Sequence, residues 1–293
     1  LAGWARAQLA VDLGDAMALV TVHNYHDLAA EFARRAGLVV PPEGSLDADA
    51  TSRYFADELP EQLLMAPETL PERFDAVVVD EGQDFADTWW VTLEALLSNP
   101  AEGPLVIFYD DNQRIYSPAA TGTYPIPRPH FRLTHNCRTT RRIHEAALAY
   151  HRGATRPECA GPEGRAAVET GTDPDATAEA LRRVLHELTQ VEGVPADEIV
   201  VLSTRGPKTS TLAEGTKLGN VTLTWGEGGP GRLRARSVHT FKGLESPVVI
   251  LAEPERAHAS NRDALLYVAL SRAQHHVVVL GLLPPGGAAG AGG

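Results

Sequence analysis

Short apolar runs alternate with helical patterns along most of this chain. Nearly unbroken apolar runs at residues 74–79, 105–109, 198–202 and 248–251 predict strands that are buried on both faces. Apolar positions recur at helical spacing in the segments 26–36, 88–97, 139–150, 181–188 and 262–273. Further short strands are predicted at 18–22, 221–225 and 277–280 and near Phe131. Strands that alternate with helices in this way predict an α/β fold with mostly parallel sheets.

A Pro-containing stretch near residues 124–131 divides this pattern into two parts. We therefore predict two lobes, residues 1–128 and 129–283, followed by a disordered Gly/Ala-rich tail at 284–293. The segment 41–71 is irregular and has room for one short helix. Because the opening residues LAGWARAQL already have a helical pattern, we expect the chain to be a piece of a longer protein.

The amino-acid composition excludes several classes of protein. With 43% hydrophobic and 22% charged residues, the 293-residue chain is typical of a globular protein. Its two cysteines, Cys137 and Cys159, exclude a disulfide scaffold and a Cys-x-x-Cys zinc site, which favours the reducing cytoplasm. No apolar run in the sequence approaches the roughly 18 residues of a membrane span, so we expect no membrane partner.

The net charge of −12 argues against a generally basic surface, but phosphate binding depends on local clusters of charge. Basic residues gather around Arg138 and again between Arg232 and Lys242. Taken alone, each cluster is typical of a solvated face.

Two carboxylates follow the first long apolar strand. Asp80 and Glu81 close the run FDAVVVDE, and ligands of parallel sheets bind beyond the carboxyl ends of the strands. Asp80 could hold Mg²⁺ and Glu81 could deprotonate an attacking water, and the nearby Gln83 and Asp84 strengthen this interpretation. In the alternative interpretation, the acidic pair only caps the next turn.

Gln113 follows the next strand, in the run YDDNQ. An amide just past a strand end could contact a γ-phosphate or the attacking water and so report that the nucleotide is bound. The alternative is an acidic loop that contains an Asx turn.

Two arginines and a Lys-Gly turn complete the candidate chemistry. Arg138 and Arg272 lie at element boundaries among apolar or small residues, where a guanidinium needs an anion such as a phosphate. The alternative for each is a structural ion pair with a carboxylate. In SVHTFKGLE, the turn at Lys242 and Gly243 exposes backbone N–H groups beside a cation, and Glu245 could accept a hydrogen bond from a ribose hydroxyl.

One expected part of a nucleotide site is absent from the sequence. No Gly-x-x-x-x-Gly-Lys-[Ser/Thr] phosphate loop occurs in these 293 residues. The chain by itself therefore lacks the usual cradle for a triphosphate.

Taken together and in order, DEGQD, YDDNQRIY, LTHNCRTT, SVHTFKGLE and LLYVALSRA resemble motifs II to VI of superfamily 1 DNA helicases of the UvrD/Rep type. The resemblance covers roughly residues 1–282. It implies two RecA-like lobes that clamp ATP and Mg²⁺, with the first lobe incomplete in this chain. It also implies 3′ to 5′ movement along single-stranded DNA and unwinding at junctions of single- and double-stranded DNA, in repair or recombination.

The resemblance also implies residue roles. Asp80 matches the Mg²⁺ ligand, Glu81 the catalytic base and Gln113 the phosphate sensor. Arg138 and Arg272 match the arginine fingers that stabilise charge on the transferring phosphoryl group.

Other positions match nucleotide or DNA contacts of the family. Glu245 matches the ribose contact, and Gln83 and Gly243 are further candidate nucleotide contacts. The segment that couples nucleotide to DNA in the family contains His239, Thr240 and Lys242.

The chain departs from the family pattern at two stacking positions. Cys137 stands where an aromatic residue commonly stacks on adenine, and Ser117 and Pro118 stand where an aromatic residue stacks on a DNA base. The short spacings between the motifs also leave no room for the large accessory subdomains of the UvrD/Rep type. The resemblance is therefore to a compact relative.

These observations leave three hypotheses. The leading one is the C-terminal portion of an ATP-dependent helicase or translocase whose phosphate loop precedes Leu1 in the same polypeptide, so that this portion alone is inactive. The second is a DNA-binding or interaction module that has lost the phosphate loop. The third is a motor directed to RNA, because backbone tracking is nearly indifferent to the sugar. The retained phosphate-facing residues favour the first over the second.

Overall fold

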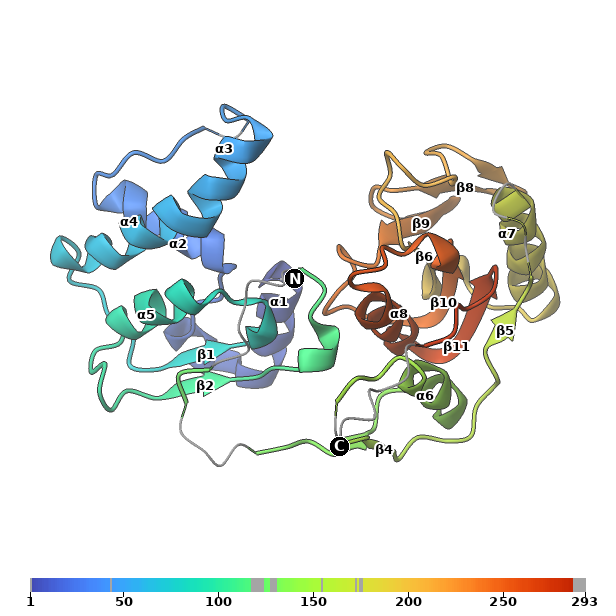
Figure 1. Ribbon diagram of the computed structural model, residues 1–293, viewed down its shortest axis with the longest axis horizontal. Helices are drawn as coiled ribbons and strands as arrows, with labels where there is room; N and C mark the ends of the chain where they lie inside the picture. Colours follow the sequence, from blue (N-terminus) through green and yellow to red (C-terminus); the bar gives the residue numbers. More distant parts are fainter. Residues whose placement is uncertain are drawn as a thin grey trace. The chain divides into compact units, whose positions relative to one another are not determined.

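The computed structural model describes residues 2–42, 44–116, 124–126, 131–153, 155–171, 173 and 176–286. These residues form two compact units (Figure 1). The first unit holds the residues up to 110 together with 124–126, and the second holds 111–116 together with the residues from 131 onward. Ser117, Pro118 and most of the predicted tail lie outside the described residues.

The first unit is mainly helical. Its elements are α1 (Ala2–Leu13), a 3₁₀ turn at Gly14–Leu19, α2 (Tyr25–Arg35), α3 (Ala48–Arg53), a π-helical turn at Tyr54–Glu58, α4 (Leu59–Met65), a 3₁₀ turn at Ala66–Glu68, β1 (Val77–Val79), a 3₁₀ turn at Gly82–Asp84, α5 (Asp87–Ala95) and β2 (Leu105–Ile107). The predicted helices at 26–36 and 88–97 are confirmed as α2 and α5. The irregular segment 41–71 contains more helix than we predicted.

The predicted strand at 18–22 is wrong. Residues through Leu19 form a 3₁₀ turn instead, and the Leu19 side chain is 89% exposed. An apolar run of this length pairs as a strand only where a neighbouring strand can accept its backbone hydrogen bonds.

The two strands of the first unit form a parallel pair, with Val77 opposite Leu105. On one side, Val79 joins a core with α2, α4 and α5. On the other side, Val78 and Val106 are 65% and 43% exposed. The carboxyl ends of both strands therefore lie at one edge of a small sheet that has one apolar face open.

The second unit is built on a larger sheet. Its elements are β3 (His135–Asn136), α6 (Arg141–Leu148), β4 (Glu158–Cys159), β5 (Val168–Glu169), α7 (Thr177–His186), β6 (Ile199–Ser203), β7 (Lys217–Leu218), β8 (Val221–Thr224), β9 (Arg232–Ser237), β10 (Ser246–Ala252), α8 (Arg262–Ser271) and β11 (Ala273–Leu280). Among the described residues, seven strands pair in the order β5-β11-β10-β6-β9-β8-β7, and of these neighbouring strands only β7 and β8 pair antiparallel. The predicted α/β fold with mostly parallel strands is confirmed.

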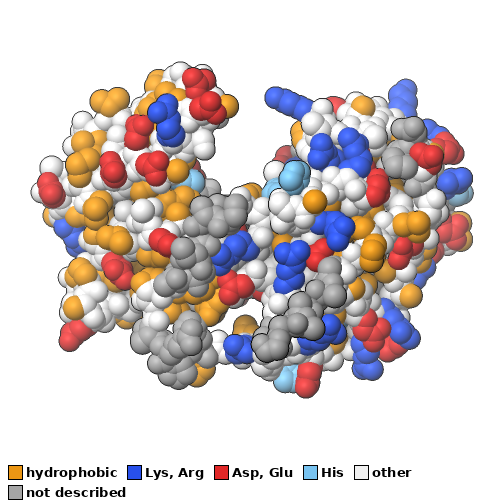
Figure 2. Space-filling view, in the orientation of Figure 1, with side chains coloured by type: hydrophobic (Ala, Val, Ile, Leu, Met, Phe, Trp, Pro, Cys, Tyr) orange, Lys and Arg blue, Asp and Glu red, His pale blue; other side chains and the backbone are white. Residues whose placement is uncertain are grey.

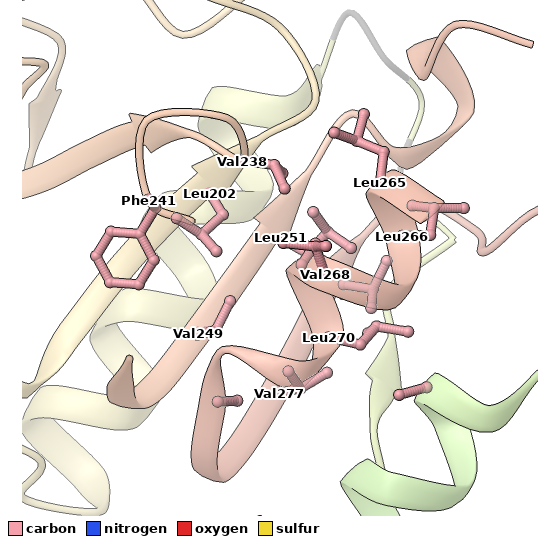
Figure 3. Packing of buried hydrophobic residues seen from close by; sticks show 14 of the residues in the cluster. Leu202, Val238, Phe241, Val249, Leu251, Leu265, Leu266, Val268, Leu270 and Val277 are labelled. Carbon is pink, nitrogen blue, oxygen red and sulfur yellow. The ribbon is translucent and has the colours of Figure 1, made fainter. Parts of the chain in front are cut away.

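Two cores lie on opposite faces of this sheet because β10 is buried on both sides. Val249 and Leu251 pack with α6 and α8, whereas Val248 and Ile250 pack with α7. Figure 3 shows the first core, in which Phe241, from the turn after β9, lies beside Leu202 of β6. Each fully buried side chain of this kind contributes roughly 2 kcal/mol through loss of apolar surface from water.

Strand β9 was missed from the sequence. Its residues, RLRARS, read as part of a basic cluster, but Leu233 and Ala235 are buried in the α7 core. Only one face of β9 is apolar, and an Arg-rich alternation is easily taken for a solvated segment.

A buried carboxylate ties the ends of two central strands together. Glu253, just after β10, has no exposed surface and a left-handed backbone with φ of 59°. Its carboxylate accepts hydrogen bonds from Ser203 Oγ at 2.5 Å, Ser210 Oγ at 2.6 Å and the Thr211 amide at 2.9 Å. It also forms an ion pair with Arg256. Burial by itself would raise the pKa of Glu253, but these donors and the Arg256 charge lower it overall.

No helix among the described residues is long and apolar enough to cross a membrane.

Glu253→Gln should lower the free energy of unfolding by about 3 kcal/mol, because a charged acceptor of several hydrogen bonds is lost from a buried site. Urea unfolding followed by circular dichroism measures the change. Since the folded-state pKa is lowered, the stabilisation is present above the unfolded value near 4.5 and is lost as the pH falls through the folded pKa. The difference in the free energy of unfolding between wild type and variant should therefore become smaller at acidic pH. Glu255→Gln, at an exposed neighbour, is the control, and equal losses in the two variants would contradict this role.

Candidate functional site

The first group of predicted residues follows β1. Asp80 is exposed and accepts a hydrogen bond from the Glu81 amide at 2.9 Å. Glu81 has a left-handed backbone, with φ of 56°. Such a backbone is uncommon outside glycine and is typical of functional turns. The structure therefore brings the predicted Mg²⁺ ligand and the predicted base together at the end of one strand.

Gln83 holds this turn in place. Its buried side chain donates to Glu81 Oε2 at 2.5 Å and accepts from the Asp110 amide at 3.0 Å. Gly82 donates to the Phe108 carbonyl, and a Cβ at Gly82 would lie 2.5 Å from Ile107 Cγ2. The turn is thus attached to the end of β2, and only glycine fits at this close approach.

The carboxylates after β1 suit a metal ion whose remaining coordination positions are filled by a bound ligand. No group of three or more His, Cys, Asp or Glu residues in the described part of the chain could hold a metal ion by itself. Mg²⁺ usually binds through one or two carboxylates and completes its coordination with phosphate and water. Asp80 can supply such a carboxylate.

Gln113 lies in the second unit, although our division of the sequence placed it with the first lobe. The turn Asp111–Gln113 is attached through Asn112, whose Oδ1 accepts from the amides of Arg152 and Gly153 at 2.9 Å. Gln113 Oε1 accepts a hydrogen bond from Arg272 Nη2 at 3.0 Å. The predicted phosphate sensor and one predicted arginine finger are therefore in direct contact.

Arg272 is almost completely buried at the end of α8, with 2% of its surface exposed. Besides Gln113, it donates to the carbonyls of Val268 and Leu244 and to Ser271 Oγ, at 3.1–3.4 Å. These bonds to neutral acceptors orient the guanidinium at the end of the helix.

Arg138 has a different environment. Its Nε lies 2.9 Å from Glu245 Oε2, and both side chains are partly exposed. Gln274 Nε2 donates to the other carboxylate oxygen of Glu245 at 2.9 Å. Asn136 Oδ1 accepts from the Arg138 amide and fixes the turn before α6. The ion pair that we considered as the structural alternative for Arg138 is thus present, and its partner is the predicted ribose contact.

The predicted DNA-coupling residues form the turn after β9. Thr240 bonds back to Ser237 through its amide and its hydroxyl. Lys242 is buried, with its ammonium 5.7 Å from the centre of the Tyr116 ring, and Gly243 has φ of 77°. The positive φ explains the glycine that follows the lysine.

His239 also contacts Tyr116, which donates a hydrogen bond to the His239 carbonyl. Burial lowers the pKa of His239; a hydrogen bond with the Ile115 backbone opposes this shift, and the Lys242 charge adds to it. The neutral form of His239 is therefore favoured.

A pocket of about 500 Å³ opens beside this turn, at the carboxyl ends of β6 and β9. Its lining consists of Tyr116, Thr204, Arg205, Gly206, Thr209, Ser237 and His239. Hydroxyl groups and a guanidinium around one pocket suit an anionic ligand. Arg205 Nε is buried and has no hydrogen-bond partner within the described residues.

Sequence reasoning missed the Thr204–Thr209 side of this pocket. The available signal was the polar run STRGPKTS directly after a buried strand, since ligands of parallel sheets bind at such ends. Because that run contains no recognisable motif, the sequence predicts no site residue within it.

Residues 232–280 match the UvrD-like helicase C-terminal domain family. This segment includes β9, the Lys242–Gly243 turn, Glu245 and Arg272, and the match confirms the resemblance to UvrD-like helicases that the motifs indicated. It supports a helicase-related role for the chain.

Comparison with solved structures gives distant likenesses. The C-terminal domain of a possible DNA helicase from Lactobacillus plantarum WCFS1 is 21% identical, with a TM-score of 0.36, and the alignment covers 51% of this chain and 90% of that one. An arterivirus nonstructural protein 10 (helicase) in complex with DNA is 15% identical, with a TM-score of 0.39, over 72% of this chain and 40% of that one. The helicase of PRRSV is 15% identical, with a TM-score of 0.41, over 87% of this chain and 45% of that one. No curated protein matches the sequence.

The two arginines of the UvrD-like pattern should differ in their effect on stability. Arg272→Ala should lower the free energy of unfolding by about 3 kcal/mol, because it leaves a cavity and removes the donor to buried carbonyl groups. Arg138→Ala should change it by less than about 1 kcal/mol, because the ion pair with Glu245 is exposed to water. Urea unfolding of the two variants measures both values, and similar losses would show that our account of these environments is wrong.

Proposed function

We propose that this chain is part of an ATP-dependent DNA helicase or translocase that couples ATP hydrolysis to movement along single-stranded DNA. The match of residues 232–280 to the UvrD-like helicase C-terminal domain family carries the proposal. From the motif resemblance, we further propose 3′ to 5′ movement, action at junctions of single- and double-stranded DNA, and a role in repair or recombination.

In the first unit, Asp80 is proposed to hold the Mg²⁺ of the nucleotide, which neutralises charge on the phosphates when bound. Glu81 is the base that accepts a proton from the attacking water. Gln83 is a positioning residue, since it binds the Glu81 carboxylate and the backbone of Asp110 at the same time.

In the second unit, Arg272 and Gln113 are proposed to act as a pair toward the γ-phosphate. The bond between them supports this assignment, because a change in contact at one side chain alters the position of the other. Arg138 is proposed to exchange Glu245 for a phosphate, which costs little because the ion pair is exposed. Glu245 is then released to bind a ribose hydroxyl.

The nucleic-acid contacts are proposed at the pocket and at the turn after β9. Arg205 and the hydroxyl groups of the pocket can bind backbone phosphates, and Tyr116 offers an aromatic surface, 53% exposed, for a base. His239, Thr240 and Lys242 join this pocket to β9 and to Tyr116. A change in the Asp111–Tyr116 segment would therefore reach the proposed DNA contacts directly.

The phosphate loop is proposed to come from another segment of the same polypeptide. Two observations support this proposal. The sequence has no such loop, and the sheet of the first unit has an open apolar face at Val78, Val106 and Phe108. An apolar sheet face of this kind is normally covered by helices in α/β proteins.

The isolated 293-residue chain should hydrolyse ATP at a negligible rate, because a triphosphate without the loop amides and lysine loses its main anchor. Release of inorganic phosphate, measured with Mg²⁺ and with and without single-stranded DNA, tests this expectation. Robust Mg²⁺-dependent turnover by the isolated chain would refute the need for another segment.

In the longer polypeptide, Glu81→Gln should abolish turnover and leave ATP binding nearly unchanged, because the amide keeps the shape of the side chain but cannot accept the proton.

Arg138→Ala should lower kcat by about a hundredfold, as expected for loss of a group that stabilises transition-state charge. DNA-stimulated ATPase activity and nucleotide affinity are measured side by side, with Glu102→Gln as the exposed control. Wild-type kcat in Arg138→Ala would leave this arginine with a structural role only. An inactive wild-type protein that still binds DNA would favour a non-catalytic binding module.

A further inference from the structure

Positive charge is concentrated in one segment of an acidic chain. Residues 204–242 contain seven Lys or Arg and two Asp or Glu, a net charge of +5 in a chain whose total is −12. The basic residues are Arg205, Lys208, Lys217, Arg232, Arg234, Arg236 and Lys242. The rest of the chain therefore carries a net charge of −17, and this segment stands out as a candidate surface for a polyanion.

Three of these arginines share one face of β9. Leu233 and Ala235 point into the core under α7, so Arg232, Arg234 and Arg236 lie on the opposite face. Next to this face, Thr222 pairs with Arg232 and Thr224 pairs with Arg234 on β8. The sheet thus has a polar, basic area at this edge, where β8 and β9 lie beside each other (Figure 1). On the face of the second unit drawn in Figure 2, Lys and Arg side chains gather over the region of β8 and β9.

The three arginines are not equivalent. Arg236 bonds to the carbonyls of Trp225 and Gly226 and to the Glu227 carboxylate, so it has a structural role. Arg232 is exposed and takes part in no ion pair with the described residues. Two positive charges of β9, on Arg232 and Arg234, thus remain without a protein anion in the part of the chain that the structure describes.

The Arg234 guanidinium lies over an aromatic ring. Its guanidinium carbon lies 5.7 Å from the centre of the Phe241 ring, and its Nε is buried without a hydrogen-bond partner among the described residues. Stacking on an aromatic ring fixes a guanidinium at low cost and leaves its outer N–H groups available for an anion.

The basic face begins at the same end of β9 as the pocket described above. Ser237, the last residue of β9, lines the pocket from the face of Leu233 and Ala235. The arginine face begins beside it at Arg236, and Arg232 lies five residues before Ser237 on the same strand. That separation is roughly 17 Å along an extended strand. A nucleic-acid backbone that leaves the pocket along β9 would meet Arg234 and then Arg232.

We propose that Arg232 and Arg234 form a second phosphate-binding surface, which extends the nucleic-acid site from the pocket along β9 toward β8. The proposal rests on the proposed function, because it assumes that single-stranded DNA binds at the pocket. Phosphate is the fitting partner because each guanidinium can donate two parallel hydrogen bonds to it. The segment contributes length and affinity to the site, and it contributes no base specificity.

Binding of oligothymidylates of two lengths, about four and about sixteen nucleotides, to the purified chain tests the proposal by fluorescence anisotropy. Arg232→Gln with Arg234→Gln should weaken binding of the longer strand on the order of tenfold at low salt. It should also reduce the slope of log affinity against log salt by about 1.4, or about 0.7 for each phosphate that the variant no longer neutralises. The shorter strand, which fills the pocket, should lose less than about twofold.

Two further variants separate the possible results. Arg182→Gln with Arg183→Gln removes the same charge from the exposed side of α7, which packs on the opposite face of the sheet, and should leave both affinities nearly unchanged. Arg205→Gln should weaken both strands, since it acts in the pocket. Arg232→Gln alone, at an exposed position, repeats the test if the double variant is misfolded.

Each outcome decides one of the two proposals. Two results would refute the second surface while DNA binding stands. In the first, the β9 variants lose no more affinity for the longer strand than the α7 variant does. In the second, the β9 variants lose as much affinity for the shorter strand as for the longer one. If the wild-type chain binds neither strand, the DNA-binding part of the proposed function fails, and the second surface fails with it.

Discussion

Burial of the central strands on both faces is the constraint on which the second unit depends. Strands β6 and β10 send alternate side chains into the α7 core and into the core under α6 and α8, so neither face can hold a polar group. Polar side chains are thereby restricted to the strand ends. Ser203, Ser237 and Glu253 occupy the carboxyl ends of β6, β9 and β10, and the pocket opens among the residues that follow. The position of the candidate site is a direct consequence of this packing.

The polar groups at these ends are organised by a few buried contacts. Glu253 fixes the loop after β6 through Ser210 and Thr211, and the same loop carries Arg205 of the pocket. Arg272 fixes Gln113 in a comparable way from the end of α8. In a low-dielectric interior such contacts are strong, and a fully satisfied network has one geometry. The loop after β6 and the Gln113 side chain are therefore held in place before any ligand binds, which reduces the entropy cost of binding.

The arginines divide into two kinds. Arg272 and Arg236 donate to backbone carbonyls and hold neighbouring segments in place. Arg138 is exposed and paired with a carboxylate, and Arg232 is exposed and forms no ion pair with the described residues. The second kind can take up an anion without loss of packing. An acidic protein can bind a polyanion through such residues, because screening limits the repulsion from distant carboxylates to about 10 Å at ordinary salt.

The sequence alone determined the parallel α/β architecture, because the unbroken apolar runs of β6 and β10 are stable only between two layers of helices. It also determined the order of the motifs, and hence the helicase resemblance. It could not reveal β9, where half of the side chains are arginines, or the failure of residues 18–22 to form a strand, because both depend on neighbours distant in sequence.

Of the candidate site, the turn at Asp80 and Glu81 was predictable from one strand end. The pairing of Arg138 with Glu245 and of Arg272 with Gln113, the position of Gln113 in the second unit, and the pocket at Arg205 were decided only by the tertiary structure. Each of these joins segments far apart in the chain. The physical reason is that the tertiary packing of strands and helices, which local patterns do not encode, brings those segments together.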